Sequence, residues 1–412
     1  MPDHHLNDTR EYRSIVFEIH RDISFHREVH LQSITIQTIH LHPISIPLVE
    51  PLKTSFGVEE DKDALLVELI TTRGHVGWGE VSVGPTPGYG PETMKTAHHI
   101  LEDFIIPSIQ KETIQDPTGV PQLLASIRGH KHTKAGIEAA VWDAYAKENE
   151  LPMADLFAAY LGDGQKPRKT AVVGVSIGIQ SSIAETIQII DKRLAQGYGR
   201  IKLKIMPNWD LDLIQAVREQ YPEITLMVDA NSAYSREDFD HLSELDKHNL
   251  LMIEQPLGHE DILEHSFLQR QMTTPLCLDE SIKSTHDLEL ALEIGACRIL
   301  NLKPARVGGF TESLSIHENC VKRELPLWIG GMLETGVGRA ANLAFASLPG
   351  VTLPSDISAT DRYFDEDISE PAFYLGPDST IAVHEGMGIG VEVQLERLER
   401  AKARRASTNP LL

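Results

Sequence analysis

The sequence has few cysteines, no long apolar run and a shortage of basic residues. Cys277, Cys297 and Cys320 are its only cysteines, and their spacing matches neither a disulfide framework nor a zinc motif. No apolar run reaches the roughly 18 residues that a membrane-spanning helix needs. Lysine and arginine total 38 against 60 acidic residues. The resulting net charge of -22 argues against a nucleic-acid partner, which demands a basic face.

The N-terminus lacks the charged-then-apolar pattern of an export signal. With so few cysteines, a reducing cytoplasm is the simplest location. The acidic balance fits badly with an anionic membrane surface. It leaves open an anionic small substrate, because a metal and a few lysines can reverse the sign locally. We therefore expect a cytoplasmic protein that acts on a small molecule, without a membrane or nucleic acid as its partner.

Residues 1–33 are polar and irregular, and we interpret them as an N-terminal extension. The segment 34–46 alternates apolar and polar residues, as a half-buried strand does. Residues 63–80 suggest a hairpin with its turn near Arg73 and Gly74. A Gly/Pro loop at 84–91 carries one exposed-looking aromatic residue, Tyr89, and helices follow at about 92–105 and 134–147. These features predict a small α+β domain over residues 34–160.

From about residue 171, short apolar runs alternate with amphipathic helical segments. Residues with reactive side chains end five successive runs. The first is Lys204. Asp229, Glu254 and Asp279 follow it at intervals of 25 residues, and Lys303 comes 24 residues after Asp279. That period suits a strand, a loop and a helix, which indicates a TIM-type barrel over 165–372. A doubly wound sheet is the alternative, but neither GxGxxG nor a phosphate loop is present. The eight candidate strands are 172–179, 200–205, 225–230, 250–256, 275–281, 297–304, 326–331 and 351–358.

Three carboxylates, Asp229, Glu254 and Asp279, would project into one barrel mouth if their runs are adjacent strands. Anions this close repel strongly unless a cation lies between them. Oxygen-only ligands favour a hard ion, Mg²⁺ or Mn²⁺, over zinc. The alternative is that each acid caps the helix after its strand. Three acids at equal intervals favour the metal site.

Strand alternation places Lys202 and Lys204 on one face and their apolar neighbours on the other. Both lysines then point into the barrel, unless the run is an edge strand with solvated lysines. Crowding of two ammonium groups would lower a lysine pKa, as a general base requires. Lys303 lies four strands round from Lys204 in an eight-stranded barrel. The pattern predicts a proton-transferring lysine on either side of the metal.

Other residues near the predicted mouth have two interpretations each. Asn231 would reach the mouth or cap a helix, and Ser176 would contact substrate or pack in the core. Arg306 would shape the electrostatics around Lys303 or form a surface ion pair. The backbone of Gly331 and Met332 would approach a ligand closely, or it would form a plain tight turn.

The sequence resembles the enolase superfamily, in its muconate-lactonizing branch. The closer resemblance is to the group of o-succinylbenzoate synthases and N-succinylamino acid racemases, and it covers residues 34 to 395. The set is specific because the motifs occur in the expected order and spacing. They are PLKTSFG (51–57), RIKLKIMPNWD (200–210), VDANSAY (228–234), IEQPL (253–257), CLDESI (277–282), KPARVGG (303–309), GGMLETGVGRAANLAFASLP (330–349) and LPSDISATDRY (353–363).

The resemblance implies a (β/α)7β barrel with an α+β capping domain, to which the C-terminal segment 373–412 returns. It implies Mg²⁺ on the three acids, Lys204 and Lys303 as acid/base residues, and Lys202 as the support of Lys204. Ser176, Asn231, Arg306 and the Gly331-Met332 backbone resemble substrate contacts. Loops carrying Phe56 and Tyr89 would close over the distal part of the substrate. Both dimers and octamers occur among such barrels, so we expect a homo-oligomer.

Two reactions are compatible with the resemblance. The first is dehydration of 2-succinyl-6-hydroxy-2,4-cyclohexadiene-1-carboxylate to o-succinylbenzoate through an enediolate, in menaquinone biosynthesis. The second is racemisation of N-succinyl or other N-acyl amino acids by proton transfer between two lysines, and one site could serve both. Muconate-type cycloisomerisation stays open, and so does a metal-binding barrel without turnover, which retention of all five residues disfavours.

Overall fold

The structure is a computed structural model that describes residues 31–408 except Phe56 and Asp163. The predicted extension at residues 1–33 therefore lies outside the described residues, apart from its last three. Within the described ranges, no helix is both long enough and apolar enough to cross a membrane.

The first sheet has four antiparallel strands in the order β3-β2-β1-β4. They are β1 (Ile34–Thr54), β2 (Gly57–Thr71), β3 (Val76–Val81) and β4 (Thr113–Ile114). The predicted hairpin is confirmed, since β2 pairs with β3 and Ile70 lies opposite Val76. Gly74 in its turn has a φ of 88°, which glycine adopts without a steric cost.

Helix α4 (Lys131–Glu148) packs closely on β3 because small residues meet at the contact. A Cβ atom on Gly77 would lie 2.1 Å from the carbonyl oxygen of Ala140, and one on Gly79 would lie 2.0 Å from that of Gly136. The predicted helices near 92–105 and 134–147 are both present. The elements around α4 are α1 (Met94–Ile100), η1 (Leu101–Ile105), α2 (Ile106–Ile109), η2 (Pro117–Gly119), α3 (Val120–Leu123) and α5 (Met153–Leu161).

The second sheet has seven parallel strands in sequential order from β6 to β12. They are β6 (Val175–Ile177), β7 (Arg200–Lys204), β8 (Thr225–Asp229), β9 (Ile253–Glu254), β10 (Leu276–Leu278), β11 (Ile299–Leu302) and β12 (Leu327–Ile329). Sequential order excludes the doubly wound alternative, in which the order reverses at a switch point.

The eighth candidate strand, 351–358, forms isolated parallel bridges rather than a continuous strand. Val351 pairs with Leu327 at the start of β12, and Ser355 pairs with Val173 just before β6. The segment thus joins the first and last strands of the curled sheet. This closure confirms the predicted TIM-type barrel with a mixed α/β capping region.

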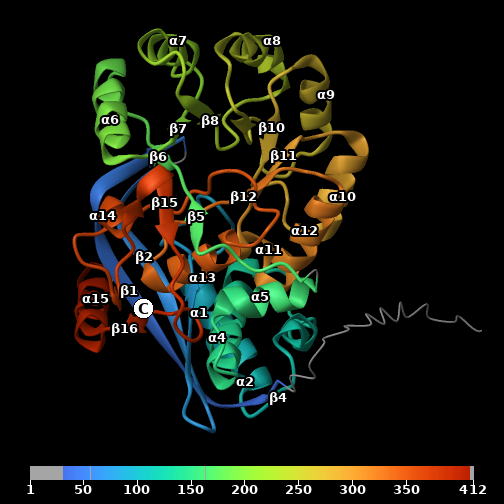
Figure 1. Cartoon of the computed structure of the whole chain (residues 1–412), viewed down its shortest axis with the longest axis vertical. Helices are drawn as coiled ribbons and strands as arrows, with labels where there is room; N and C mark the ends of the chain where they lie inside the picture. The colour runs from blue at the N-terminus through green and yellow to red at the C-terminus, as the bar shows by residue number, and fades with distance from the viewer. Residues whose placement is uncertain (1–30, 56, 163, 409–412) are drawn as a thin grey trace, which may run out of the picture. The chain divides into compact units, whose positions relative to one another are not determined.

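Helices α6 to α10 lie on the outer side of the barrel strands (Figure 1). Inside, beneath the polar strand ends, a buried apolar cluster of Met227, Met252, Cys277, Ile299 and Trp328 fills the barrel. The elements of this region are α6 (Ile183–Gln196), α7 (Leu211–Gln220), η3 (Arg236–Asp238), α8 (Phe239–Ser243), η4 (Glu244–His248), α9 (Leu263–Gln271), α10 (Thr285–Ile294), α11 (Pro304–Val307), α12 (Phe310–Lys322), α13 (Gly336–Ala346) and α14 (Thr360–Tyr363).

The C-terminal part of the chain contacts the first sheet. Helix α15 (Leu395–Thr408) lies against β1, and Arg405 pairs with Asp63 of β2 at 2.9 Å. These contacts support the predicted return of residues 373–412 to the capping domain, while the domain limits themselves stay predictions. The short elements before α15 are β13 (Ser369–Glu370), β14 (Leu375–Gly376), η5 (Pro377–Ser379), β15 (Thr380–Ala382), which pairs with β5 (Thr170–Val172), and β16 (Glu392–Val393).

Candidate active site

The three predicted metal ligands lie on neighbouring strands at one end of the barrel. Asp229 at the end of β8 is the register partner of Glu254 at the end of β9. Glu254 in turn pairs with Cys277, so Asp279 follows two residues beyond on the same face. All three side chains are at most 1% exposed. None of the three acids makes a side-chain cap to a helix, which argues against the capping alternative.

Lys202 and Lys204 point into the barrel as predicted, and both are buried. The Nζ atom of Lys204 lies 2.6 Å from Asp229 Oδ2 and 2.6 Å from Asn231 Oδ1. Lys202 Nζ lies 3.0 Å from Glu254 Oε2 and 3.2 Å from Asp229 Oδ2, and it also pairs with Asp356. An edge strand with solvated lysines is therefore excluded.

Lys303 stands directly after β11, four strands round the barrel from β7. Its Nζ atom lies 2.8 Å from Asp279 Oδ2 and 4.3 Å from the centre of the Tyr89 ring. The two lysines therefore attach to opposite ends of the row of acids, Lys204 to Asp229 and Lys303 to Asp279. This is the arrangement that the spacing predicted.

The expected lowering of a lysine pKa by a neighbouring ammonium group is wrong for Lys202, and the pKa of Lys303 on the other side of the mouth is raised as well. Burial by itself lowers their pKa values, but the surrounding carboxylates outweigh burial and raise the pKa of both lysines. The prediction considered two ammonium groups side by side and left out the acids between them. A negative neighbour at hydrogen-bond distance stabilises the charged lysine.

The same contacts divide the acids. Burial raises the pKa of Asp229, yet Lys204 and Lys202 hold it well below its usual range. Glu254 has the opposite balance, because burial and the neighbouring Asp229 charge raise its pKa to about 8. The acids of the row are therefore not equivalent, since the pKa of Asp229 is lowered and that of Glu254 is raised.

The donor set fits a hard divalent cation by its chemistry. All its donors are carboxylate oxygens, and they lie where burial and then the Asp229 charge raise the pKa of Glu254. In this structure, lysine and arginine side chains contact these acid oxygens. Within the described part of the chain, no three His, Cys, Asp or Glu side chains are arranged so that they could hold a metal ion as they stand. The residues fit the ion by type, charge and strand position.

Arg306 is buried, which excludes the surface ion pair considered from the sequence. Its guanidinium contacts Asp279 Oδ1, and it donates to the carbonyl oxygens of Ile282 at 2.7 Å and Asn301 at 2.6 Å. It also lies 3.3 Å from the hydroxyl oxygen of Tyr89. Arg306 therefore links Asp279 to the loop that carries Lys303.

Tyr89 is not the exposed loop residue that the sequence suggested. Its hydroxyl group donates to Asp279 Oδ1 at 2.8 Å, and its ring covers Lys303. Burial, followed by the nearby Asp279 charge, raises the pKa of the tyrosine. The Gly/Pro loop thus places a capping side chain inside the barrel mouth.

The remaining predicted contacts lie around the same mouth. Asn231 is buried, accepts from Lys204 and donates to Glu280 at 3.1 Å. Ser176, on β6, donates to Asp356 at 3.1 Å. A Cβ atom on Gly331 would lie 2.3 Å from the carbonyl oxygen of Asp356, so close packing explains that glycine. Phe56 lies outside the described residues.

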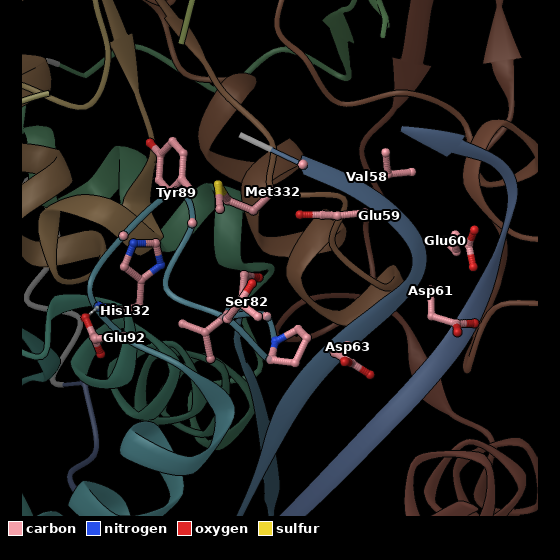
Figure 2. Close-up of a pocket in the computed structure, with 17 residues that line it drawn as sticks. Val58, Glu59, Glu60, Asp61, Asp63, Ser82, Tyr89, Glu92, His132 and Met332 are labelled. Atoms are coloured by element: carbon pink, nitrogen blue, oxygen red, sulfur yellow. Dashed lines mark hydrogen bonds between the residues drawn. The ribbon is translucent and has the colours of Figure 1, made fainter. Parts of the chain in front are cut away.

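Met332 is held from both sides. Its backbone N–H donates to Glu334 Oε2 at 2.8 Å, and its carbonyl oxygen accepts from Lys62 of β2 at 2.8 Å. A cavity of about 350 Å³ lies beside it, between the first part of β2 (Gly57–Asp63) and the loop 82–92. Figure 2 shows Glu59 pointing toward Met332, with Tyr89 and His132 on the other side of Met332.

A second cavity, of about 550 Å³, borders the first at Gly88–Gly90. Tyr89, Asn231, Glu280 and Arg306 line it. Two of these residues contact the predicted site, since Asn231 accepts from Lys204 and Arg306 contacts Asp279.

Sequence reasoning missed three polar residues of this mouth. Asp356 pairs with Lys202 and with Arg200 at 2.6 Å, Asn301 donates to Glu254 Oε1 at 2.6 Å, and Glu280 contacts Asn231. Asn301 lies two residues before Lys303, so strand alternation could have identified it. Asp356 lies in the candidate strand 351–358, and its partners Arg200 and Lys202 are so far away in the sequence that spacing does not pair them with it.

Comparisons with known proteins place these observations in a family. Residues 36–158 match the mandelate racemase / muconate lactonizing enzyme N-terminal domain, and residues 185–398 match the enolase C-terminal domain-like family. The chain is 43% identical to the o-succinylbenzoate synthase of Geobacillus stearothermophilus over 89% of the chain and 96% of that relative. It is 42% identical to the N-succinylamino acid racemase of Thermus thermophilus, over 89% of the chain and 96% of the relative.

Solved structures agree with these matches. A crystal structure of an enolase superfamily member from Listeria innocua is 42% identical, with a TM-score of 0.84 over 89% of this chain and 97% of that one. The muconate lactonizing enzyme from Pseudomonas fluorescens is 24% identical, with a TM-score of 0.81 over 89% and 99%. At that identity the second likeness concerns the fold alone.

Proposed function

This chain belongs to the enolase superfamily, in the group of o-succinylbenzoate synthases and N-succinylamino acid racemases, and we propose that it is an enzyme that forms o-succinylbenzoate. The proposed reaction is the dehydration of 2-succinyl-6-hydroxy-2,4-cyclohexadiene-1-carboxylate. The observation that carries it is the pair of buried lysines at opposite ends of one row of acids. Relatives named o-succinylbenzoate synthase at 40–43% identity support the choice of reaction.

Asp229, Glu254 and Asp279 would hold a Mg²⁺ ion, and Mn²⁺ suits the same donors. The bound ion would polarise the substrate carboxylate and stabilise the negative charge that develops as the α-proton leaves. Lys202 contacts Glu254 and Asp229, so it would hold these two acids in place and add positive charge beneath them.

Lys204 would act as the base and then as the acid. In its neutral form it takes the α-proton, and the resulting ammonium group returns a proton to the departing hydroxide, which leaves as water. Asn231 accepts a hydrogen bond from Lys204, so it would set the direction of the amine. Lys303 would remain an ammonium group on the other face. Burial lowers its pKa, but Asp279 and the other nearby negative groups outweigh burial and raise it.

Racemisation of N-acyl amino acids is the second candidate, and the position of Lys303 favours it. A 1,1-proton transfer needs a base on each face of the α-carbon. Lys303 has a position symmetrical to that of Lys204, with an acid partner at a similar distance. The first step, loss of the α-proton, is common to both reactions, so one site would serve both.

Two assays on the purified protein with Mg²⁺ separate the proposals. The first follows water loss from the cyclohexadiene substrate, and the second follows α-deuterium exchange of N-succinyl amino acids in D₂O. We expect dehydration in the first assay. Absence of dehydration together with rapid exchange would leave only the racemase, and absence of both would overturn the proposed function.

A further inference from the structure

Helix α4 of the capping region contacts the barrel loop that follows Lys303. Lys131 at the start of the helix donates from Nζ to the carbonyl oxygen of Val307 at 3.2 Å and to that of Lys283 at 2.6 Å. Val307 ends the short helix α11, and Lys283 lies in the loop between Asp279 and α10. One ammonium group from the cap thus joins the two barrel loops around Lys303 and its acid partner.

The connection from Val307 back to Lys303 is short and rigid. The carbonyl oxygen of Lys303 accepts from the backbone N–H groups of Arg306 at 3.0 Å and Val307 at 3.2 Å. Residues 303–307 therefore form a single hydrogen-bonded turn. A displacement of Val307 would move the backbone of Lys303 with it.

Glu138 fixes the other end of the same segment. It lies seven residues after Lys131, which is two turns of helix α4 on the same face. Its Oε1 accepts from the backbone N–H of Thr311 at 3.1 Å. Gly309, with a φ of 130°, packs so closely on Glu138 that a Cβ atom could not fit. The segment 303–311 is thus held by α4 at two points.

On the Lys204 side the cap makes a longer contact, in which the Ser55 hydroxyl donates to the backbone carbonyl oxygen of Asn231 at 3.3 Å. Among the described residues, the Lys131 amine itself donates only to the loops around Lys303. Lys204 bonds to Asp229 and Asn231, which both belong to the barrel. From this difference, and resting on the proposed function, we infer that Lys131 is a positioning residue that sets Lys303, and not Lys204, for proton transfer. Its effect would therefore be confined to one face of the α-carbon.

The test follows α-proton exchange of each enantiomer of an N-succinyl amino acid in D₂O. The Cα–H bond breaks, the proton goes to a lysine amine, and the exchanged ammonium group returns a deuteron to carbon. Lys303→Ala identifies the enantiomer whose proton faces Lys303. The variants are Lys131→Met, Lys131→Arg and the matched control Lys134→Met, whose amine bonds to Ile127 within the cap.

Lys131→Met should slow exchange on the Lys303 face by about 10- to 100-fold, because small displacements of a reacting group cost that much. Exchange on the Lys204 face and dehydration should stay within about threefold. Lys131→Arg should restore most of the loss, since its guanidinium can donate to the same two carbonyl oxygens. Lys134→Met should leave both faces unchanged.

Two outcomes would overturn the inference. Equal loss on both faces would mean that Lys131 supports the whole site or contacts substrate, and no loss would mean that the loop holds Lys303 without it. Melting temperatures of the variants distinguish a folding defect, which slows both faces together. A wild-type protein with neither exchange nor dehydration would instead contradict the proposed function, so the two failures are distinguishable.

Discussion

The two sides of the barrel mouth hold their lysines in different ways. Lys204 is bonded by Asp229 and Asn231, which belong to the next strand and the loop after it. Lys303 is bonded by Asp279 and covered by Tyr89 from the cap. Its loop is also held by Arg306 and by helix α4.

The difference separates the shared reaction step from the step that distinguishes the two candidate reactions. The barrel supplies both direct hydrogen-bond partners of the lysine that dehydration and racemisation both need. The capping region helps to fix the lysine that only racemisation needs as a base. Changes to the cap should therefore alter the ratio of the two activities more than changes to the β7–β8 side do.

Removing Lys204 should have the largest effect, because it is the base for the shared step. Lys204→Ala should lower kcat for dehydration by about 1000-fold or more, within the range of general acid–base catalysis. Steady-state kinetics measure this loss. The control is Lys247→Ala, which removes an exposed lysine that pairs with Glu244 in η4. Retained dehydration in Lys204→Ala would place the base elsewhere.

Weakening the metal site should affect both sides equally. Glu254→Gln should reduce Mg²⁺ affinity by at least about 100-fold, since even the partners of metal ligands contribute about 10- to 100-fold. Titration calorimetry measures binding, and both exchange rates should fall together. Unchanged Mg²⁺ affinity would show that Glu254 is not a ligand.

Two conservative variants should separate the two sides by smaller amounts. Asn231→Ala removes an acceptor from Lys204, and Tyr89→Phe removes the hydroxyl group that donates to Asp279 while it keeps the ring over Lys303. Each lost hydrogen bond is worth about 1 kcal/mol, or about fivefold in rate. Enantiomer-resolved exchange should show each loss on its own face. Equal losses on both faces in either variant would show that the residue does not act through one lysine alone.

Glu138→Gln should change the pH dependence of stability rather than the reaction. Burial raises the pKa of Glu138 from 4.5 to about 7. Between those values the folded state keeps a proton that the unfolded state has lost, so stability falls as pH rises through this window. Between pH 4.5 and 7 the free energy of unfolding of the variant should therefore rise relative to that of the wild type, by at most about 3 kcal/mol. Urea unfolding at several pH values measures it, and parallel curves would contradict the assignment.

The sequence predicted the barrel and its main residues because both follow from local periodicity. Asp229, Glu254 and Asp279 end successive apolar runs, and parallel strand order brings such ends together. The contacts of Tyr89 and Lys131 could not be predicted, since each joins a capping element to a barrel loop far along the chain. The raised lysine pKa values also depend on which charge lies nearest in three dimensions, and spacing does not reveal that.

The most direct test of a lysine on each face of one carbon is enantiomer-resolved exchange in Lys204→Ala and Lys303→Ala. Each purified variant, with Mg²⁺, is incubated in D₂O with either enantiomer of an N-succinyl amino acid, and α-deuterium is followed by NMR. We expect each variant to lose exchange with one enantiomer and to retain it with the other, in opposite senses. Loss of the same enantiomer in both variants, or exchange of both enantiomers in either one, would contradict the account.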